Sequence, residues 1–539
     1  MSDAGSGAPA KTDVERLHEL GYAQELKRGM GGFSNFAVSF TIISILSGCL
    51  TLFGYGMFVG GPSSSAYGWP VVGLFVTFVA LAMAEVCSSY PTAGGLYYWS
   101  AKLAPRNGPA WAWFTGWFNF LGQVAVTAGI DFGFAAFFSA LLNIGFDIAP
   151  TKTSLIITYT IVLAIHGLMN TFGIKLVALL NDVSVWWHVI GVLVIFAILF
   201  IVPDQHTSWG TIFSFSSTPS APDQVPGFIN GTGFTNGFFG TTLYIFLIGM
   251  LLAQYTLTGY DASAHMTEET HQAEVSGPRG VYRSVVISII FGWILLLGVW
   301  HAVQGQAGYD AAAAFQLDAT GNIAAPAQIF LDATSKGLAT FMLLIVVGAQ
   351  FFCGMASVTA NSRMIYAFSR DGALPASKRW HTINKRTRTP TNSIWLAVVL
   401  SWLLVAPAFW LGSLVAYFAV TSIAVVGLYI AYVMPTYLRL RAGDAFKPGP
   451  WNLGKWSRPV GTIAVIWTVF ICIMLMMPQF CPCGNSAWDW INYAPIAVAS
   501  VIGFAGIWWV VSARKWFKGP KVMGSDEELA AIEADLESV

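Results

Sequence analysis

Twelve long apolar segments, separated by short polar stretches that carry Gly or Pro, constrain this chain more than any other feature of its sequence. An apolar run of about 20 residues is long enough to cross a bilayer core of roughly 30 Å. Charged residues make up only 10% of the chain, whereas a soluble domain carries about 25%. The sequence therefore predicts an all-α polytopic membrane protein with twelve transmembrane helices. The predicted spans are residues 34–60, 70–90, 110–141, 154–172, 176–202, 240–270, 282–304, 338–369, 392–411, 414–438, 460–480 and 491–513.

The positions of Lys and Arg predict how these spans are oriented. Cytoplasmic loops of membrane proteins accumulate both residues. If the N-terminus is inside and the spans alternate, 25 of the 27 Lys and Arg residues fall on the cytoplasmic side, and the exceptions are Lys152 and Lys336. A wrong number of spans would scramble this sorting. We therefore expect a multi-pass protein of the cell membrane, with cytoplasmic ends at residues 1–32 and 515–539 and a transporter domain at 33–514.

Two of the predicted spans, the first and the sixth, are interrupted by glycine near their middle. In lipid, broken helices occur only where they line a cavity, because their free backbone groups must be satisfied. Carriers place such breaks in corresponding positions of two repeats, around the substrate. The predicted substrate-binding residues are therefore those at the two breaks: Ser47, Gly48, Cys49, Thr258, Gly259, Tyr260 and Asp261.

The direction of the two spans indicates what the breaks can bind. The outer half of the first span is expected to begin near Gly48, where free backbone N–H groups attract an anion. The outer half of the sixth span is expected to end near Thr258, where free carbonyl groups attract a cation. Asp261 adds a full negative charge beside these carbonyls. This arrangement suits an amino acid zwitterion, and the extra carboxylate favours a small amine-bearing solute.

Ionisable residues inside the spans are functional candidates, because a charge in the bilayer costs about 2.5–3.5 kcal/mol on insertion scales. His188 lies near the centre of the fifth span and can change charge near neutral pH. It is the candidate for binding a coupling proton, with a neutral packed imidazole as the alternative. Asp131 and His166 are expected to be structural. Four acidic residues near cytoplasmic ends of spans are expected to form ion pairs with Arg or Lys: Glu85, Asp182, Glu268 and Glu269.

The sequence does not indicate an enzyme. It shows no metal-ligand spacing, no phosphate-binding loop and no nucleophile–base pair, so no catalytic residue, cofactor or metal is predicted. Zero net charge gives no reason to expect a nucleic-acid partner. A channel remains an alternative from a different class, because rings of charge or carbonyl groups around a pore also occur in polytopic proteins.

Four parts of the sequence carry a resemblance to a known family. They are Leu20–Arg28 with Phe33–Phe36, Ala84–Glu85 with Tyr90–Tyr97, Gly259–Glu269, and Ser362–Pro375. In this order and at these positions, they are similar to the amino acid–polyamine–organocation superfamily. Within it, the chain resembles the amino acid/choline transporter family of GABA, choline and related permeases. The resemblance covers roughly residues 18–515.

The resemblance implies a LeuT-like fold, with two inverted repeats of five helices at about 33–202 and 240–438 and two extra helices at about 460–513. It implies secondary active transport of amino acids or amines such as GABA, by alternating access around the two breaks. Choline, polyamines and obligate amino acid exchange stay open as alternatives, as does the direction of transport.

Individual positions refine what the resemblance implies. The superfamily's Gly-Ser-Gly turn falls on Leu46-Ser47-Gly48, so Leu46 replaces its first glycine. Asp261 falls where some exchangers have Asn, which supports its role as an amine partner. His188 falls where several carriers have a lysine that substitutes for sodium, which favours proton coupling. The alternative is a sodium ion held by hydroxyl groups of Ser357 and Thr359.

Overall fold

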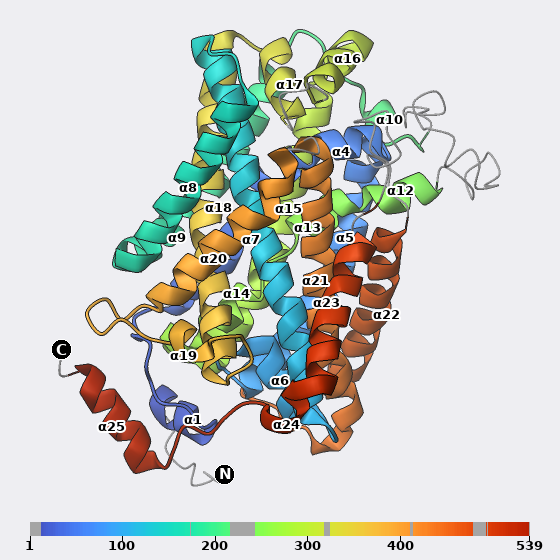
Figure 1. Ribbon diagram of the computed structural model, residues 1–539. Helices are drawn as coiled ribbons and strands as arrows, with labels where there is room; N and C mark the ends of the chain where they lie inside the picture. Colours follow the sequence, from blue (N-terminus) through green and yellow to red (C-terminus); the bar gives the residue numbers. More distant parts are fainter. Residues whose placement is uncertain are drawn as a thin grey trace, which may run out of the picture.

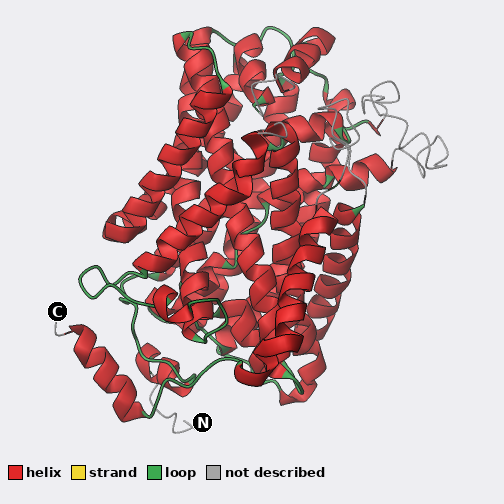
Figure 2. Cartoon of the chain, in the orientation of Figure 1, coloured by secondary structure: helices red, strands yellow, loops and turns green. Residues whose placement is uncertain are grey.

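The computed structural model describes residues 12–172, 174–215, 243–316, 324–409, 413–477, 492 and 494–537. Within these residues the regular structure is helical and no β-strand forms (Figure 2). In the described part of the chain, ten helices are long and apolar enough to cross a membrane. Two shorter apolar helices, Leu243–Thr256 and Thr391–Val405, occupy the positions of the sixth and ninth predicted spans. The protein is therefore an all-α polytopic membrane protein, as the sequence predicts.

The helices follow the predicted spans closely. In chain order they are α2 (Gly32–Ile43) continued by α3 (Ile45–Thr51) and α4 (Phe53–Phe58), α5 (Trp69–Ser89), α7 (Gly108–Phe146), α8 (Lys152–Phe172), α9 (Ile174–Ile201), α12 (Leu243–Gly249) continued by α13 (Leu251–Thr256) and α14 (Ala262–His265), α15 (Ala273–His301), α18 (Lys336–Arg370), α20 (Thr391–Val405), α21 (Ser413–Ala442), α22 (Ser457–Met476) and α23 (Ala494–Trp508).

Further helices lie in connections that the sequence analysis left as loops. They are α1 (Asp13–Glu19), α6 (Gly95–Leu103), α16 (Gly305–Gln316), α17 (Ala325–Ala333) and α25 (Asp526–Glu537). Helices α16 and α17 lie at one end of the bundle, which we call the top, and α1 and α25 lie at the other end, which we call the base (Figure 1). The two ends of the described chain therefore share one side of the bundle, as an even number of spans requires.

Local chemistry sets several of the helix ends. Helix α1 begins with a capping box, in which Thr12 and Glu15 each accept a hydrogen bond from the other's backbone N–H. Helix α18 begins after Ser335, whose hydroxyl oxygen accepts the N–H of Leu338. Proline stands in the first turn of α5 and α7, where its missing N–H costs no helical hydrogen bond.

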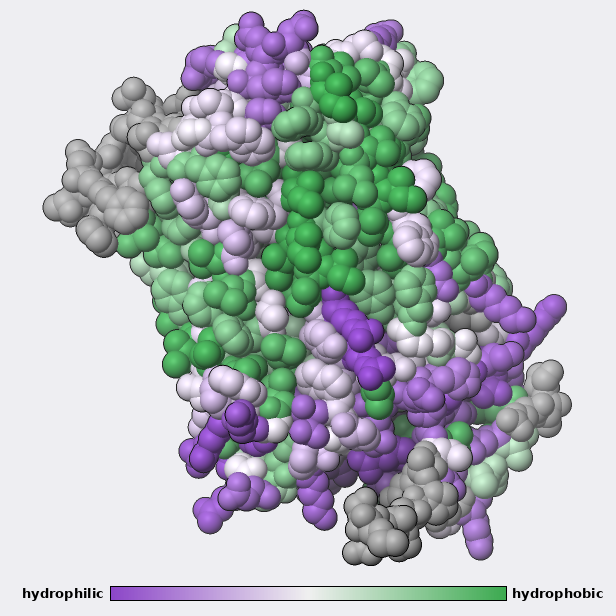
Figure 3. All heavy atoms as spheres, turned by 180° about the vertical axis from the view of Figure 1, so that it is seen from behind, coloured by the Kyte–Doolittle hydropathy of each residue, from purple (hydrophilic) through white to green (hydrophobic). Residues whose placement is uncertain are grey.

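Helices α7, α18 and α21 form the interior of the bundle, and α7 packs along both of the others. Most side chains of α7 and α18 are buried. The helices around them expose large apolar side chains, such as Ile190 of α9, Ile466 of α22 and Ile507 of α23. Figure 3 shows hydrophobic residues gathered over the middle of one face and hydrophilic ones toward its two ends. This distribution is expected of a protein whose middle part is surrounded by lipid.

Candidate substrate and coupling site

The first membrane helix is broken at Ser44. Helix α2 ends at Ile43, Ser44 has the left-handed backbone conformation (φ 35°, ψ 80°), and α3 begins at Ile45. The outer half of this span therefore begins three residues before Gly48, near which the sequence predicts its start. Ser47, Gly48 and Cys49 are helical instead, and the N–H groups of Ser47 and Gly48 donate to the carbonyl of Ser44 at 2.8 and 2.9 Å.

Gly48 is needed for a close approach rather than for the break. A Cβ atom at this position would lie 2.6 Å from Oγ1 and 2.9 Å from Cα of Thr256. Helices α3 and α13 can therefore cross at Gly48 only because it has no side chain. Small residues serve this purpose widely in membrane helices.

The sixth membrane helix is interrupted where the sequence predicts. Helix α13 ends at Thr256, and helical structure resumes with α14 at Ala262. Gly259, in the gap, has φ +94°, which side-chain-bearing residues rarely adopt. A Cβ atom there would also lie 2.4 Å from a methyl group of Ile42. This glycine is thus required both by the turn and by the contact with α2.

A small cavity lies between the two interruptions. Its volume is about 10 Å³, enough for roughly one water. Its lining includes three of the predicted residues, Ser47, Gly48 and Thr258. Cys49, Gly259, Tyr260 and Asp261 are buried nearby but are not part of the lining. The other lining residues are Ile42, Ile43, Val126, Ile130, Tyr255, Thr256 and Cys353.

Asp261 is fully buried and held by side chains from three helices. Gln123 Nε2 of α7 donates to its Oδ2 at 2.8 Å, and the Tyr432 hydroxyl of α21 donates to its Oδ1 at 2.6 Å. His265 Nε2 of α14 lies 3.3 Å from Oδ2. Its other ring nitrogen, Nδ1, lies 2.8 Å from the carbonyl oxygen of Ala93. The carboxylate is therefore part of a polar cluster beside the cavity.

The sequence analysis did not single out Gln123, Tyr432 or His265. Gln123 and Tyr432 come from distant spans, so no local pattern marks them. His265 could have been found, because it follows Asp261 by four residues and side chains at this spacing meet on a helix.

His188 contacts the break in the first helix directly. Its Nε2 lies 2.7 Å from the Ser44 hydroxyl oxygen, and its Nδ1 lies 2.8 Å from the carbonyl oxygen of Ser184. A carbonyl only accepts, so Nδ1 carries a hydrogen and Nε2 can accept from Ser44. The side chain is fully buried, with Phe40 at its edge. The fifth span thus places an ionisable group on the residue at which α2 ends.

The two hydroxyl groups considered for sodium do not point to a common place. Ser357 Oγ is bonded to Thr127 Oγ1 of α7 at 2.9 Å, whereas Thr359 Oγ1 donates to Asn170 Oδ1 of α8 at 2.6 Å. Among the described residues, no group of three or more His, Cys, Asp or Glu is placed to hold a metal ion.

Comparison with known proteins identifies the family. A family model described as amino acid permease matches residues 30–502. The chain belongs to this family. It is 42% identical to Amino-acid permease BAT1 of Arabidopsis thaliana, over 94% of this chain and 95% of that protein. It is 30% identical to the GABA-specific permease of Saccharomyces cerevisiae over 98% and 89% of the two chains. It is 27% identical to a putative polyamine transporter of Candida albicans, over 96% and 90%.

The permease family is a family of transporters and not of enzymes. Its members take small solutes, amino acids and amines, across membranes, so the buried cavity between two interrupted helices is the natural place to look for the cargo.

Two buried ion pairs lie on the base side of the sixth helix. Glu268 pairs with Arg370 at 2.9 Å and Glu269 pairs with Arg363 at 2.8 Å. Glu85 likewise lies 3.3 Å from Arg439. These three pairs confirm the expected partners. Asp182 differs, because its described hydrogen bond comes from the Ser34 hydroxyl.

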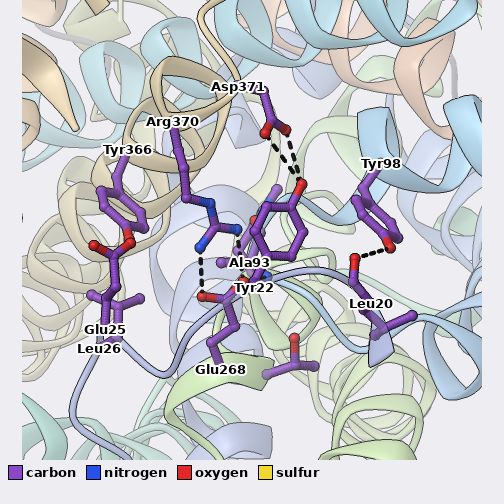
Figure 4. Close-up of polar contacts among 12 residues, drawn as sticks. Leu20, Tyr22, Glu25, Leu26, Ala93, Tyr98, Glu268, Tyr366, Arg370 and Asp371 are labelled. Atoms are coloured by element: carbon purple, nitrogen blue, oxygen red, sulfur yellow. Dashed lines mark hydrogen bonds and ion pairs between the residues drawn. The ribbon is translucent and has the colours of Figure 1, made fainter. Parts of the chain in front are cut away.

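The chain before the first span covers the Glu268–Arg370 pair (Figure 4). The guanidinium of Arg370 lies 3.8 Å from the ring centroid of Tyr22, and the Tyr22 hydroxyl donates to Asp371. Ala93 N–H donates to Glu268 Oε1 at 2.9 Å. Burial raises the pKa of Asp371, while Arg370 and hydrogen bonds from Lys521, Tyr97 and Tyr22 oppose that rise. The base of the permease is thus closed by a layer of charged and aromatic contacts.

A larger cavity opens beside this layer. It has a volume of about 990 Å³ and reaches Thr359 and Met266 from the α8–α9 junction. Four of its lining residues are basic: Lys27, Lys175, Arg386 and Arg388.

Asp131 and His166, which the sequence analysis expects to be structural, lie elsewhere. Asp131 Oδ1 of α7 lies 2.9 Å from His166 Nδ1 of α8.

Proposed function

We propose that this permease is a secondary active transporter that moves amino acids or related amines such as GABA across the cell membrane by alternating access. The observation that carries the proposal is the small cavity between two interrupted helices, inside a membrane-spanning bundle. The relatives named as an amino-acid permease and a GABA-specific permease support the choice of cargo. A channel is disfavoured, because the cavity has room for about one water molecule and offers no continuous pore.

The cargo is placed in this cavity, with its amine toward the interrupted sixth helix. Thr258 lines the cavity there, and Asp261 is the nearby carboxylate that pairs with the amine when the helix moves. The present cavity is too small for an amino acid, so binding requires such a movement. The proposed cargo site consists of Ser47, Gly48, Cys49, Thr258, Gly259, Tyr260 and Asp261.

The base is proposed to face the cytoplasm. Basic residues concentrate in the segments assigned to that side, and the large basic cavity opens between them. Residues 33–202 and 240–438 are taken as the two repeats, with breaks in corresponding positions. Transport to the cytoplasm then requires opening of the layer formed by Tyr22, Arg370 and Glu268.

Proton coupling through His188 is the proposed driving force. The contact between its Nε2 and the Ser44 hydroxyl supports this role, because a proton on the ring would reverse the direction of that hydrogen bond. Sodium coupling through Ser357 and Thr359 is less favoured, since their hydroxyl groups bond to different helices. A polyamine or choline cargo stays the alternative, because Asp261 pairs with any cationic nitrogen and one relative is named a putative polyamine transporter.

Uptake of radiolabelled GABA into proteoliposomes of purified protein, with and without an inside-alkaline pH step, tests the proposal. Saturable accumulation that the pH step stimulates is expected. Saturable uptake that is unchanged by the pH step would support a transporter but contradict proton coupling. If GABA is not taken up but competition assays show transport of another amine, that amine replaces GABA as the proposed cargo.

A further inference from the structure

Among the described residues, the side chains that contact the Asp261 carboxylate are Gln123, Tyr432 and His265, and only His265 can carry a positive charge. Asp261 and His265 are both fully buried. Two acidic residues that follow on the same segment are already paired, Glu268 with Arg370 and Glu269 with Arg363. Three tyrosines, at positions 260, 429 and 432, complete the titratable groups around the carboxylate. If His265 is neutral and Asp261 ionised, one buried negative charge has no counter-charge, which is costly inside a membrane.

Hydrogen-bond geometry points to the same shortage. The Ala93 carbonyl oxygen can only accept, so His265 Nδ1 carries a hydrogen toward it. The opposite nitrogen, Nε2, lies 3.3 Å from Asp261 Oδ2. In a neutral ring that nitrogen is an acceptor, and its lone pair would face an ionised oxygen at this distance. A proton on the carboxyl group removes the repulsion and leaves Nε2 as an acceptor for the amide nitrogen of Asn119.

The surrounding hydrogen-bond donors are uncharged. Gln123 donates to Asp261 Oδ2 and Tyr432 donates to Oδ1, which compensates part of the carboxylate's lost hydration. Asn119 of α7 contributes its amide nitrogen 3.3 Å from His265 Nε2. None of these three side chains carries a formal charge near neutral pH. The balance of the cluster therefore depends on a proton shared by Asp261 and His265.

We propose that Asp261 and His265 bind one exchangeable proton between them, as a proton site separate from His188. Its role in transport rests on the proposed function. A cargo ammonium that reaches Asp261 supplies the same positive charge, so loading of the amine and release of this proton become linked steps. The site also adjoins the closed base, because Ala93 joins His265 through its carbonyl oxygen and Glu268 through its N–H.

The first test measures stability and needs no cargo, so it stands apart from the proposed function. Melting temperatures of the purified full chain are compared at about pH 5 and about pH 8 for the wild type, His265→Gln, Asp261→Asn and the double variant. Gln at 265 keeps a donor for Ala93 but cannot titrate. We expect His265→Gln to lose several degrees more than the wild type as pH rises, since Asp261 must then hold the proton alone. Adding Asp261→Asn should remove that loss.

Two outcomes overturn the shared proton. One is a His265→Gln variant whose melting temperature follows pH as the wild type does. The other is a double variant that keeps the full loss of His265→Gln. If His265→Gln alone yields no folded protein, recovery of folded protein in the double variant supports the proposal, and failure to recover overturns it.

The second test measures the role in transport. His166→Gln is the matched control, because His166 is equally buried and lies 2.9 Å from a carboxylate, that of Asp131, but does not contact Asp261. We expect His265→Gln to retain exchange of GABA at equal pH and to lose accumulation driven by a pH step of either polarity. The control should retain both. If His265→Gln accumulates GABA in response to the pH step as the wild type does, the Asp261–His265 pair has no role in proton coupling. If the wild type itself shows no exchange of GABA, the result counts against GABA as the cargo instead.

Discussion

His188 Nε2 lies 2.7 Å from the hydroxyl oxygen of Ser44, the left-handed residue at which the first membrane helix breaks. Nδ1 donates its hydrogen to the carbonyl oxygen of Ser184, so a second proton on this imidazole would bind at Nε2. A neutral ring accepts from Ser44, and a protonated ring donates to it. The protonation state of His188 in the fifth span is thereby connected to the break in the first span.

Replacement of His188 by Ala should uncouple flux from the proton gradient. The variant loses the titratable group at the break but keeps the cavity lining, so exchange of GABA at equal pH is expected to persist. Uptake into proteoliposomes with an imposed pH step measures the effect. His301→Ala is a suitable control, because His301 lies at the far end of α15 and contacts Thr207. A His188→Ala variant that still responds fully to the pH step would contradict the coupling role.

Replacement of Gly48 by Ala should destabilise the crossing of α3 and α13. The new Cβ atom would lie 2.9 Å from Cα of Thr256, and backbone cannot move aside as a flexible side chain can. Overpacking of this kind costs about 1–3 kcal/mol. The melting temperature should fall and GABA uptake should decrease. Gly503→Ala on α23 provides the comparison, since nothing lies within 4 Å of its added Cβ atom, and equal stability of the two variants would refute the argument.

The sequence predicted the spans because apolar length alone decides whether a helix can cross a bilayer. It also located the interruption of the sixth helix, since Gly259 has a conformation that favours glycine. The outer half of the first helix begins at Ile45, three residues before the predicted Gly48, for a physical reason. Ser44 has no local preference for the left-handed region, and its contact with His188 comes from a distant span.

The side chains that surround Asp261 could not be predicted from the sequence, for a similar reason. Gln123 and Tyr432 are brought to the carboxylate by the packing of α7 and α21 against the sixth helix. No periodicity in either span distinguishes these positions from ordinary buried polar residues. The ion pairs of Glu268 and Glu269 were predictable in kind, because buried charges require partners, but the choice of Arg370 and Arg363 required the fold.

Replacement of Glu268 by Gln should strongly destabilise the base of the permease. Arg370 would be left buried without a carboxylate, and breaking a buried pair in this way costs about 3–5 kcal/mol. Thermal unfolding of the purified protein measures the loss. Asp147→Asn is the matched control, because Asp147 pairs with Lys336 at an exposed site, where such pairs contribute about 0–1 kcal/mol. Glu268→Gln with unchanged stability would show that the pair does not hold the base closed.

The pKa of Asp371 predicts a pH dependence with a defined sign. Burial raises this pKa from its ordinary value of 3.8, so the folded protein holds the proton more tightly than the unfolded chain. The contribution of Asp371 to stability is therefore present at low pH and is lost as pH rises through the raised pKa. We expect the melting temperature of the wild type, relative to Asp371→Asn, to fall as pH rises above about 4. A constant difference over this range would be inconsistent with the raised pKa.

Replacement of Asp261 by Asn should abolish transport while leaving expression and folding intact. Asn retains an oxygen that can accept from Tyr432 or Gln123, so the cluster keeps part of its hydrogen bonding. It has no charge to pair with a cargo ammonium, and an uncharged partner cannot offset the cost of burying that ammonium. Uptake of radiolabelled GABA should therefore fall to the level of protein-free liposomes, with normal elution on size exclusion. Asp310→Asn on the exposed helix α16 should transport normally, because this carboxylate accepts a hydrogen bond from Gln306 of the same helix and lies outside the proposed cargo site. Unchanged transport kinetics in Asp261→Asn would remove this carboxylate from the cargo site, and the amine would then have to be held by the uncharged groups of the cavity alone.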